Sequence, residues 1–136
     1  MDTTQRSQHF PGTLGVKHAT GLWRIASAGS TEYYLDLDEN RVVRARGSGS
    51  GRFPFDNQWT QFIDVICYDT ATGVPEPDVI KLGGRPRYRF DPDPSWPDAE
   101  WRLQRIVTVI ERLTGPEATA IRARFAPASA PGPLAS

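Results

Sequence analysis

Two aspartate pairs are the residues with the clearest capacity for chemistry. Asp36 and Asp38 stand two residues apart after a hydrophobic run. There, one carboxylate could attack a phosphoryl group while the other transfers a proton. Asp91 and Asp93 could hold a divalent cation together with a later acidic residue. A divalent-metal-dependent hydrolase built on one of these pairs is therefore one function to test.

Both pairs also have a simpler, structural explanation. The spacing of Asp36 and Asp38 resembles that of phosphatases of the haloacid dehalogenase type. That chemistry needs a parallel sheet, a phosphate-binding hydroxyl, a lysine and further acidic ligands, and the pattern of this chain does not supply them. We expect Asp36 to pair across a hairpin with Arg44, and Asp91 and Asp93 to lie beside a helix N-terminus. Accordingly, no catalytic residue and no metal site is predicted.

Arginines interleaved with aromatic residues are the second feature. Arg85, Arg87 and Arg89 alternate with Pro86, Tyr88 and Phe90, so in a strand their guanidinium groups project from one face. Between Glu39 and Asp56 the chain carries four more arginines and no acidic residue. Combined with two tyrosines, these arginines predict a partner-binding surface. Its residues are Arg44, Arg46, Arg85, Arg87, Tyr88, Arg89 and Tyr34.

The charge balance favours a protein as the partner of this surface. Sixteen Lys and Arg residues balance sixteen Asp and Glu residues, so the net charge is zero. Binding that depends on phosphate neutralisation usually needs a net positive field. A single-stranded nucleic acid, held by arginines and stacked on tyrosines, is the alternative. Steep loss of affinity with salt would indicate nucleic acid, whereas a protein interface should change much less.

Other catalytic arrangements find little support in the composition. His9 and His18 are the only histidines, and both lie in the polar N-terminal segment, where no rigid shell would hold a catalytic base. Cys67 is the only cysteine and lies in an apolar run, which is typical of an inert buried thiol. We therefore predict a protein that is not an enzyme and has no cofactor.

The clearest structural pattern covers residues 21–47, where apolar and polar residues alternate around two turn signals. It predicts a three-stranded antiparallel meander with three-residue loops at 28–30 and 39–41. This register opposes Asp36 to Arg44 and favours a left-handed conformation at Asn40. It also predicts one shared apolar face, made of Trp23, Ile25, Tyr33, Leu35, Leu37, Val43 and Ala45.

The remaining elements are predicted from the spacing of apolar residues and from turn and cap residues. Residues 47–52 are predicted to form a Gly/Ser loop, which either binds a partner or only connects two elements. Apolar residues at helical spacing predict amphipathic helices near 56–67 and 95–113, although β-branched residues in both segments leave strands possible. A second hairpin is predicted at 78–90 around Gly83 and Gly84, and a short helix at 117–125.

These elements predict an α+β fold: the meander, possibly extended by the second hairpin, packed against one or two amphipathic helices. Residues 21–125 are expected to form a single domain. Residues 1–20 read as a flexible N-terminal segment, and residues 126–136 as a disordered Ala/Pro/Ser tail.

The segment from Trp23 to Arg44, WRIASAGSTEYYLDLDENRVVR, resembles a pattern found in small uncharacterised proteins of actinobacteria and their phages. The pattern is Trp-Arg-Val/Ile, then Tyr before Leu-Asp-Leu-Asp, and a later Val-x-Arg. It covers about a sixth of the chain. The resemblance implies an origin in these organisms and supplies no catalytic residue.

The expected function is that of a small cytoplasmic accessory protein, which acts by protein–protein interaction and without catalysis. No apolar run near the start suits a signal peptide, and no later run suits a membrane span. Neither the identity of the partner nor the oligomeric state follows from the sequence.

Overall fold

The computed structural model describes residues 10–92 and 98–128 of the 136-residue chain. Its elements, in chain order, are β1 (Thr13–Gly15), β2 (Leu22–Ser27), β3 (Glu32–Asp36), β4 (Arg41–Ala45), β5 (Gln58–Asp69), β6 (Pro75–Pro77), β7 (Val79–Lys81), β8 (Gly84–Asp91), β9 (Glu100–Leu103), β10 (Val107–Leu113), α2 (Gly115–Arg124) and β11 (Ala126–Pro127). Within these residues no helix is long and apolar enough to cross a membrane.

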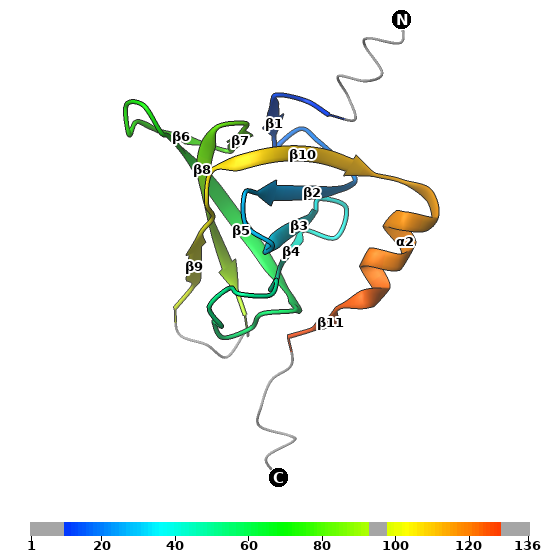
Figure 1. Cartoon of the computed structure of the whole chain (residues 1–136). Coiled ribbons are helices and arrows are strands. Elements are labelled where there is room, and N and C mark those ends of the chain that lie inside the picture. The colour runs from blue at the N-terminus through cyan, green and yellow to red at the C-terminus, as the bar shows by residue number, and fades with distance from the viewer. Residues whose placement is uncertain (1–9, 93–97, 129–136) are drawn as a thin grey trace, which may run out of the picture.

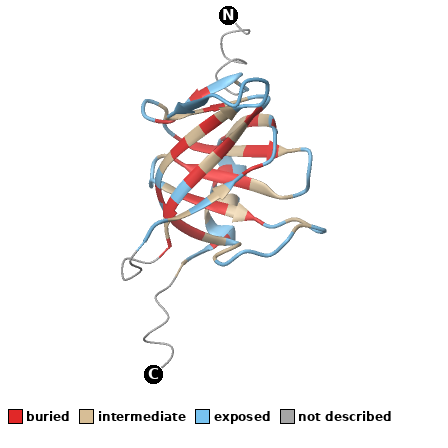
Figure 2. Ribbon diagram, turned by 90° about the vertical axis from the view of Figure 1, so that its left-hand side faces the viewer, coloured by how far each residue is buried: buried red, intermediate tan, exposed pale blue. Residues whose placement is uncertain are grey.

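One antiparallel sheet dominates the molecule. Its strand order is β10-β2-β3-β4-β5-β8-β9, with β6 and β11 also paired to β5. The sheet curls round so that one face encloses a core, as Figure 1 shows. Buried residues recur along the strands in Figure 2, as expected for strands with one face inward. The interior core comprises Leu14, Val16, Trp23, Ile25, Tyr33, Leu35, Val42, Phe62, Val65, Ile80, Tyr88, Phe90, Val107 and Ile110.

Gln104 bridges the two ends of this curled sheet, in the link between β9 and β10. Its side chain accepts a hydrogen bond from the Tyr88 hydroxyl on β8 at 2.7 Å. The same side chain donates to the carbonyl of Ile25 on β2 at 2.9 Å. One buried amide therefore joins strands that lie near opposite ends of the sheet order.

The predicted meander is present as β2, β3 and β4. The β2–β3 register agrees with the expectation, since Trp23 pairs with Leu35, and Asn40 adopts a positive φ of 56°. The β3–β4 register was predicted wrongly. Residues 37–40 form a four-residue turn, and Asp36 pairs with Arg41 instead of Arg44. This odd shift moves the β4 side chains to the opposite faces of the sheet.

A second core explains why this register is stable. Val43 and Ala45 do not join Trp23 in the interior, as predicted, but lie on the outer face beneath α2. The prediction assumed that only one face of the meander is buried. Because α2 covers the other face, both faces can bury apolar residues. This second core comprises Leu22, Tyr34, Val43, Ala45, Trp59, Leu113, Ala118 and Phe125.

Residues 56–67 form most of β5, so the helix predicted here is wrong. The register of β5 against β8 shifts between Phe62 and Asp64. A β-bulge inserts one residue into the alternation of a strand. Phe62 and Val65, on either side of the bulge, therefore both face the interior core three residues apart. Trp59 is buried in the second core on the other face, and the three buried residues together imitate helical spacing.

The helix predicted at 95–113 is also wrong within the described residues. Residues 100–103 form β9 and residues 107–113 form β10, whose register shifts between Val107 and Val109. The shift again places two interior residues three apart, Val107 and Ile110. Leu113 is buried in the second core on the other face of the strand. The β propensity of the IVTVI run indicated the correct state. Residues 95–97 lie outside the described residues.

The remaining expectations are met in part. The extended runs at 78–90 exist, but β7 pairs with β1 and β8 pairs with β5, so they do not form the predicted hairpin ladder. The short helix predicted at 117–125 is α2, the one helix of the described residues. The predicted α+β class is therefore confirmed in outline, but the fold contains more strands than predicted.

The ordered part of the chain extends beyond both predicted domain boundaries. Leu14 and Val16 are buried in the interior core, so the flexible N-terminal segment predicted at 1–20 is wrong for these residues. At the other end, β11 pairs in parallel with β5, and the tail prediction is wrong for Ala126 and Pro127. The predictions for residues 1–9 and 129–136 lie outside the described residues.

Candidate interaction site

The outer side of β8 carries the three alternating arginines. Pro86, Tyr88 and Phe90 point into the protein and are buried, so Arg85, Arg87 and Arg89 lie on the other side of the strand. β9 pairs with β8 and adds exposed apolar side chains, with Leu103 opposite Arg87 and Trp101 opposite Arg89. The β8–β9 face is defined here by Arg85, Arg87, Arg89, Trp101 and Leu103.

The β8–β9 face carries two exposed large apolar side chains next to its arginines. Trp101 is 56% exposed and Leu103 is 40% exposed. The guanidinium carbon of Arg87 lies 5.8 Å from the centre of the Trp101 ring, a cation–π geometry. A large exposed aromatic beside arginine is the composition enriched at protein interfaces.

The three arginines of this face differ in their charge partners. Arg89 forms a bidentate pair with Asp64 on β5, at 3.1 Å and 2.5 Å. Arg85 donates to the uncharged backbone carbonyl of Gln104 at 3.1 Å. Neither Arg85 nor Arg87 makes an ion pair within the described ranges. The face therefore keeps two uncompensated positive charges.

The two tyrosines assigned to the surface are buried, which corrects that part of the prediction. Tyr88 stacks on Tyr33 inside the sheet, with ring centres 4.5 Å apart. Burial raises the pKa of Tyr88 well above its usual value. Tyr34 lies beneath α2 against Phe125, where burial and the Glu32 carboxylate raise its pKa to about 12. Neither ring is available to stack a base.

Arg44 in β4 and Arg46 just after it contact the Gly/Ser loop, residues 47–52, and lie outside the β8–β9 face. Arg44 donates to Asp56 at 2.6 Å and lies over the Phe53 ring, 4.6 Å from its centre. Arg46 donates to the carbonyl of Ser50 at 3.0 Å. The seven residues predicted to form one surface therefore divide among the β8–β9 face, the loop and the buried cores.

The Gly/Ser loop, residues 47–52, is held against the β2–β3 turn. Ser30 donates to the carbonyl of Ser48 at 2.7 Å, and Thr31 accepts from the amide of Gly47 at 3.0 Å. A β-carbon at Gly47 would lie 2.4 Å from the backbone carbonyl carbon and oxygen of Ser30. This close approach requires glycine at position 47.

Replacing Gly47 with alanine should lower the free energy of unfolding by about 1–2 kcal/mol, because the backbone of Ser30 would have to move. The matched control is Gly51→Ala in the same loop, where nothing lies within 4 Å of the new β-carbon. That change should be neutral or slightly stabilising. Urea unfolding of both variants measures the difference, and equal stabilities would contradict the close approach.

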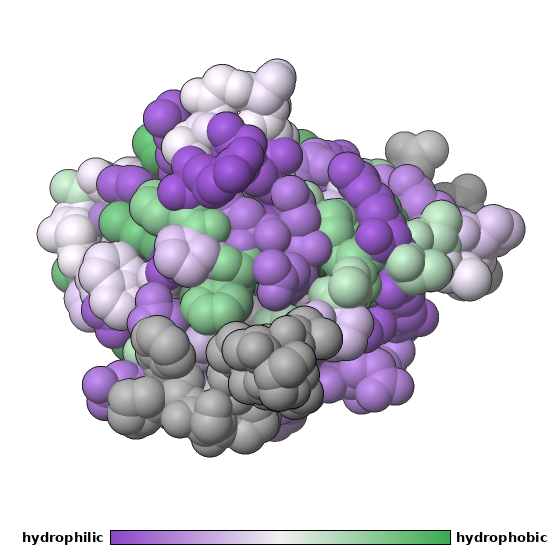
Figure 3. All heavy atoms as spheres, turned by 90° about the horizontal axis from the view of Figure 1, so that it is seen from below, coloured by the Kyte–Doolittle hydropathy of each residue, from purple (hydrophilic) through white to green (hydrophobic). Residues whose placement is uncertain are grey.

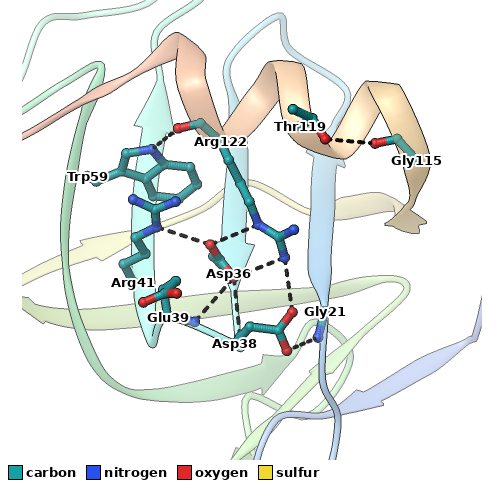
Figure 4. Close-up of polar contacts among 9 residues, drawn as sticks. All are labelled: Gly21, Asp36, Asp38, Glu39, Arg41, Trp59, Gly115, Thr119 and Arg122. Carbon is teal, nitrogen blue, oxygen red and sulfur yellow. Dashed lines mark hydrogen bonds and ion pairs between the residues drawn. The ribbon is translucent and has the colours of Figure 1, made fainter.

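Asp36 and Asp38 form a network with two arginines (Figure 4). Asp36 is fully buried and accepts hydrogen bonds from Arg41 at 3.0 Å and from Arg122 of α2 at 3.2 Å. Arg122 also donates to Asp38 at 3.0 Å, and Asp38 accepts from the amide of Gly21 at 2.9 Å. A metal ion would have to displace these arginines.

This network ties α2 to the sheet. Trp59 donates from its indole nitrogen to the carbonyl of Arg122 at 3.2 Å. Arg41 lies over the Trp59 ring, 4.3 Å from its centre. The prediction that Asp36 pairs across the hairpin with Arg44 is wrong, because its arginine partners are Arg41 and Arg122.

Across residues 10–92 and 98–128, no group of three or more His, Cys, Asp or Glu side chains is arranged to hold a metal ion. Of the second aspartate pair, Asp91 is the last residue of β8, and Asp93 lies outside the described residues.

Sequence reasoning missed the apolar half of the β8–β9 face. Trp101 and Leu103 fell in a segment assigned to a helix, where they would not share a face with the arginines of β8. The signal that could have found them is the alternation in Glu-Trp-Arg-Leu, residues 100–103, whose exposure alternates in the structure. Seen from below, the molecule shows apolar side chains dispersed among hydrophilic ones (Figure 3).

No protein-family model, no curated protein and no solved structure matches this chain. A proposal for the function of this chain therefore rests on the geometry of its own residues.

Proposed function

We propose that this chain is a non-catalytic accessory protein that binds an acidic protein partner through the β8–β9 face. The observation that carries the proposal is the exposed Trp101 beside Arg87, with Leu103 on the next outward position of β9. A tryptophan and an arginine in contact are the residue types that most often dominate binding energy at protein interfaces.

The charges of the face favour an acidic partner. Arg85 and Arg87 have no carboxylate partner within the described ranges, so carboxylates of a docking protein can pair with them. Such pairs raise association rates and fix orientation. Trp101 and Leu103 then provide the apolar contact that becomes buried.

Burial of the two tyrosines favours a protein over a nucleic acid at this face. Single-strand binding relies on aromatic rings that stack on bases, and Tyr34 and Tyr88 are inside the protein. The exposed residue next to Trp101 on this face is the aliphatic Leu103, which suits a protein contact. An actinobacterial or phage origin and a cytoplasmic location remain predictions from the sequence.

A comparative pull-down from a lysate of the source organism tests the proposal. Wild type, Trp101→Ala, Arg87→Glu and Val74→Ala serve as baits, with and without nuclease and at two salt concentrations. Val74 is an exposed apolar control on the turn between β5 and β6, at the other end of the molecule from β9 (Figure 1).

We expect one protein that wild type and Val74→Ala recover equally and that survives nuclease. Trp101→Ala should weaken its binding by about thirtyfold or more, as measured by calorimetry with the purified prey, because loss of a hot-spot residue costs at least about 2 kcal/mol. Recovery that nuclease abolishes would contradict the proposal in favour of nucleic acid. Equal binding by all four baits would exclude this face.

A further inference from the structure

We propose that a cavity beside the Gly/Ser loop binds the phosphate group of a small ligand of the nucleoside phosphate class. The cavity has a volume of about 400 Å³, within the usual range for ligand pockets of about 300–1,000 Å³. The β2–β3 turn, the Gly/Ser loop and the link between β9 and β10 line most of it, and Arg44 of β4 and Arg85 of β8 add to its wall.

The positive charge of this cavity points to an anion. Arg44, Arg85 and Arg105 line it, and no Asp or Glu is among its lining residues. Asp56 compensates Arg44 at 2.6 Å. Arg85 and Arg105 make no ion pair in the part of the chain that the structure describes. Arginine presents several donors in a planar fork that matches the oxygens of a phosphate.

Uncharged donors surround the same space. Five serine and threonine residues line the cavity: Ser27, Ser30, Thr31, Ser48 and Ser50. Ser30 already donates to the carbonyl of Ser48 and Thr31 to the hydroxyl of Ser50, so Ser27, Ser48 and Ser50 supply the hydroxyl donors for a ligand. The amides of Ser48 and Gly49 donate to no other group among the described residues, and Gly49 has a positive φ of 80°. Turns with free successive amides are common anion-binding sites. Phosphate oxygens accept from both hydroxyl and amide donors.

The loop that contributes these groups is held in place by contacts within the protein. Ser30 and Thr31 anchor it, and Gly47 approaches the backbone of Ser30 too closely for any side chain. A pre-formed site loses less entropy on binding than a mobile loop does. The loop therefore forms a pre-organised site for an anion.

An apolar wall indicates that the ligand carries more than a phosphate. Phe53 is half-exposed and Leu103 is exposed at the cavity. The guanidinium of Arg44 packs on the Phe53 ring at 4.6 Å. A nucleoside phosphate has both parts that this site matches, since its base can contact the Phe53 ring and its phosphate can meet the arginines.

Calorimetry and thermal unfolding with defined probes test this inference. The probes are AMP, ADP, adenosine, inorganic phosphate and a short single-stranded oligonucleotide. ADP and AMP should bind and raise the melting temperature, because a ligand specific for the folded state stabilises it. Adenosine should bind far more weakly, and added salt should weaken the nucleotides.

Paired variants locate the site. Arg85→Ala/Arg105→Ala should weaken nucleotide binding by about tenfold or more, since a hydrogen bond to a charged group contributes about 1.5–3 kcal/mol. Arg52→Ala removes one positive charge from a neighbouring residue that does not line the cavity, and should bind like wild type. Unfolding without ligand shows that each variant is folded.

Three results would overturn the inference. They are absence of binding by every phosphate probe at millimolar concentration, equal affinity of wild type and the double variant, and much tighter binding of the oligonucleotide than of ADP. Trp101→Ala should retain nucleotide binding, so this proposal and the protein-docking proposal fail separately.

Discussion

Replacing Asp36 with asparagine should lower the free energy of unfolding by about 3 kcal/mol. Removing one partner of a buried ion pair typically costs about 3–5 kcal/mol, because the remaining charge is left without compensation. The lower end applies here, since Arg41 and Arg122 are 27% and 34% exposed and water screens them. An asparagine side chain at this position would also accept only weaker, uncharged hydrogen bonds from the two guanidinium groups.

The pH dependence of stability provides a second readout of the same pair. Burial opposes ionisation of Asp36, but hydrogen bonds and charge from Arg122 and Arg41 outweigh it and lower its pKa. A lowered folded-state pKa contributes stability that is fully present above the unfolded value of about 3.9. The contribution is lost as the pH falls through the lower folded-state pKa. The gap between wild type and Asp36→Asn should therefore close below about pH 4.

Urea unfolding between pH 7 and strongly acidic pH measures both effects. The matched control is Asp38→Asn, because Asp38 shares Arg122 but its carboxylate is 48% exposed. Exposed pairs contribute little, so this change should cost less than about 1 kcal/mol. If Asp36→Asn were as stable as wild type at neutral pH, the buried network would not hold α2 on the sheet.

Replacing Gln104 with alanine should cost about 3 kcal/mol, because the change leaves two buried polar groups unpaired. Gln104 is 3% exposed. Its side chain accepts from the Tyr88 hydroxyl at 2.7 Å and donates to the Ile25 carbonyl at 2.9 Å. Each orphaned group costs about 1–3 kcal/mol, and the loss loosens β10 and β2 from β8.

Gln61 provides the control for this substitution, since it is an exposed glutamine on β5. Gln61→Ala should change stability by less than about 0.5 kcal/mol. Tyr88→Phe removes one half of the bridge, and Gln104→Ala in that background should cost less than it does in wild type. Additive losses in the double variant would contradict the bridge between the two sheet ends.

Local patterns in the sequence determined several elements of this protein. The alternation and turn signals of residues 21–47 predicted β2, β3 and β4, and the β2–β3 register was correct. The alternation of Arg85, Arg87 and Arg89 indicated one outer face, and α2 lies where a short helix was expected. These features depend on nearest neighbours along the chain, for which period and turn chemistry are sufficient.

Only the tertiary structure decided the rest, because long-range contacts set it. The bulges in β5 and β10 exist where those strands meet their partners. Together with burial on both faces of these strands, they gave the buried residues the spacing of a helix. The register of β4 depends on α2, which buries the second face of the meander. Arg122 meets Asp36 from a helix 86 residues away.

Long-range contacts also explain why the two candidate sites differ from the surface that was predicted from the sequence. Tyr34 and Tyr88 carry polar hydroxyls that suit a surface, yet Glu32 and Gln104 satisfy those hydroxyls inside the protein. Trp101 became part of the β8–β9 face through pairing of β9 with β8. Residue types in the sequence predicted that arginines and aromatic rings matter, and the contacts of the fold decided which of them remain exposed to a partner.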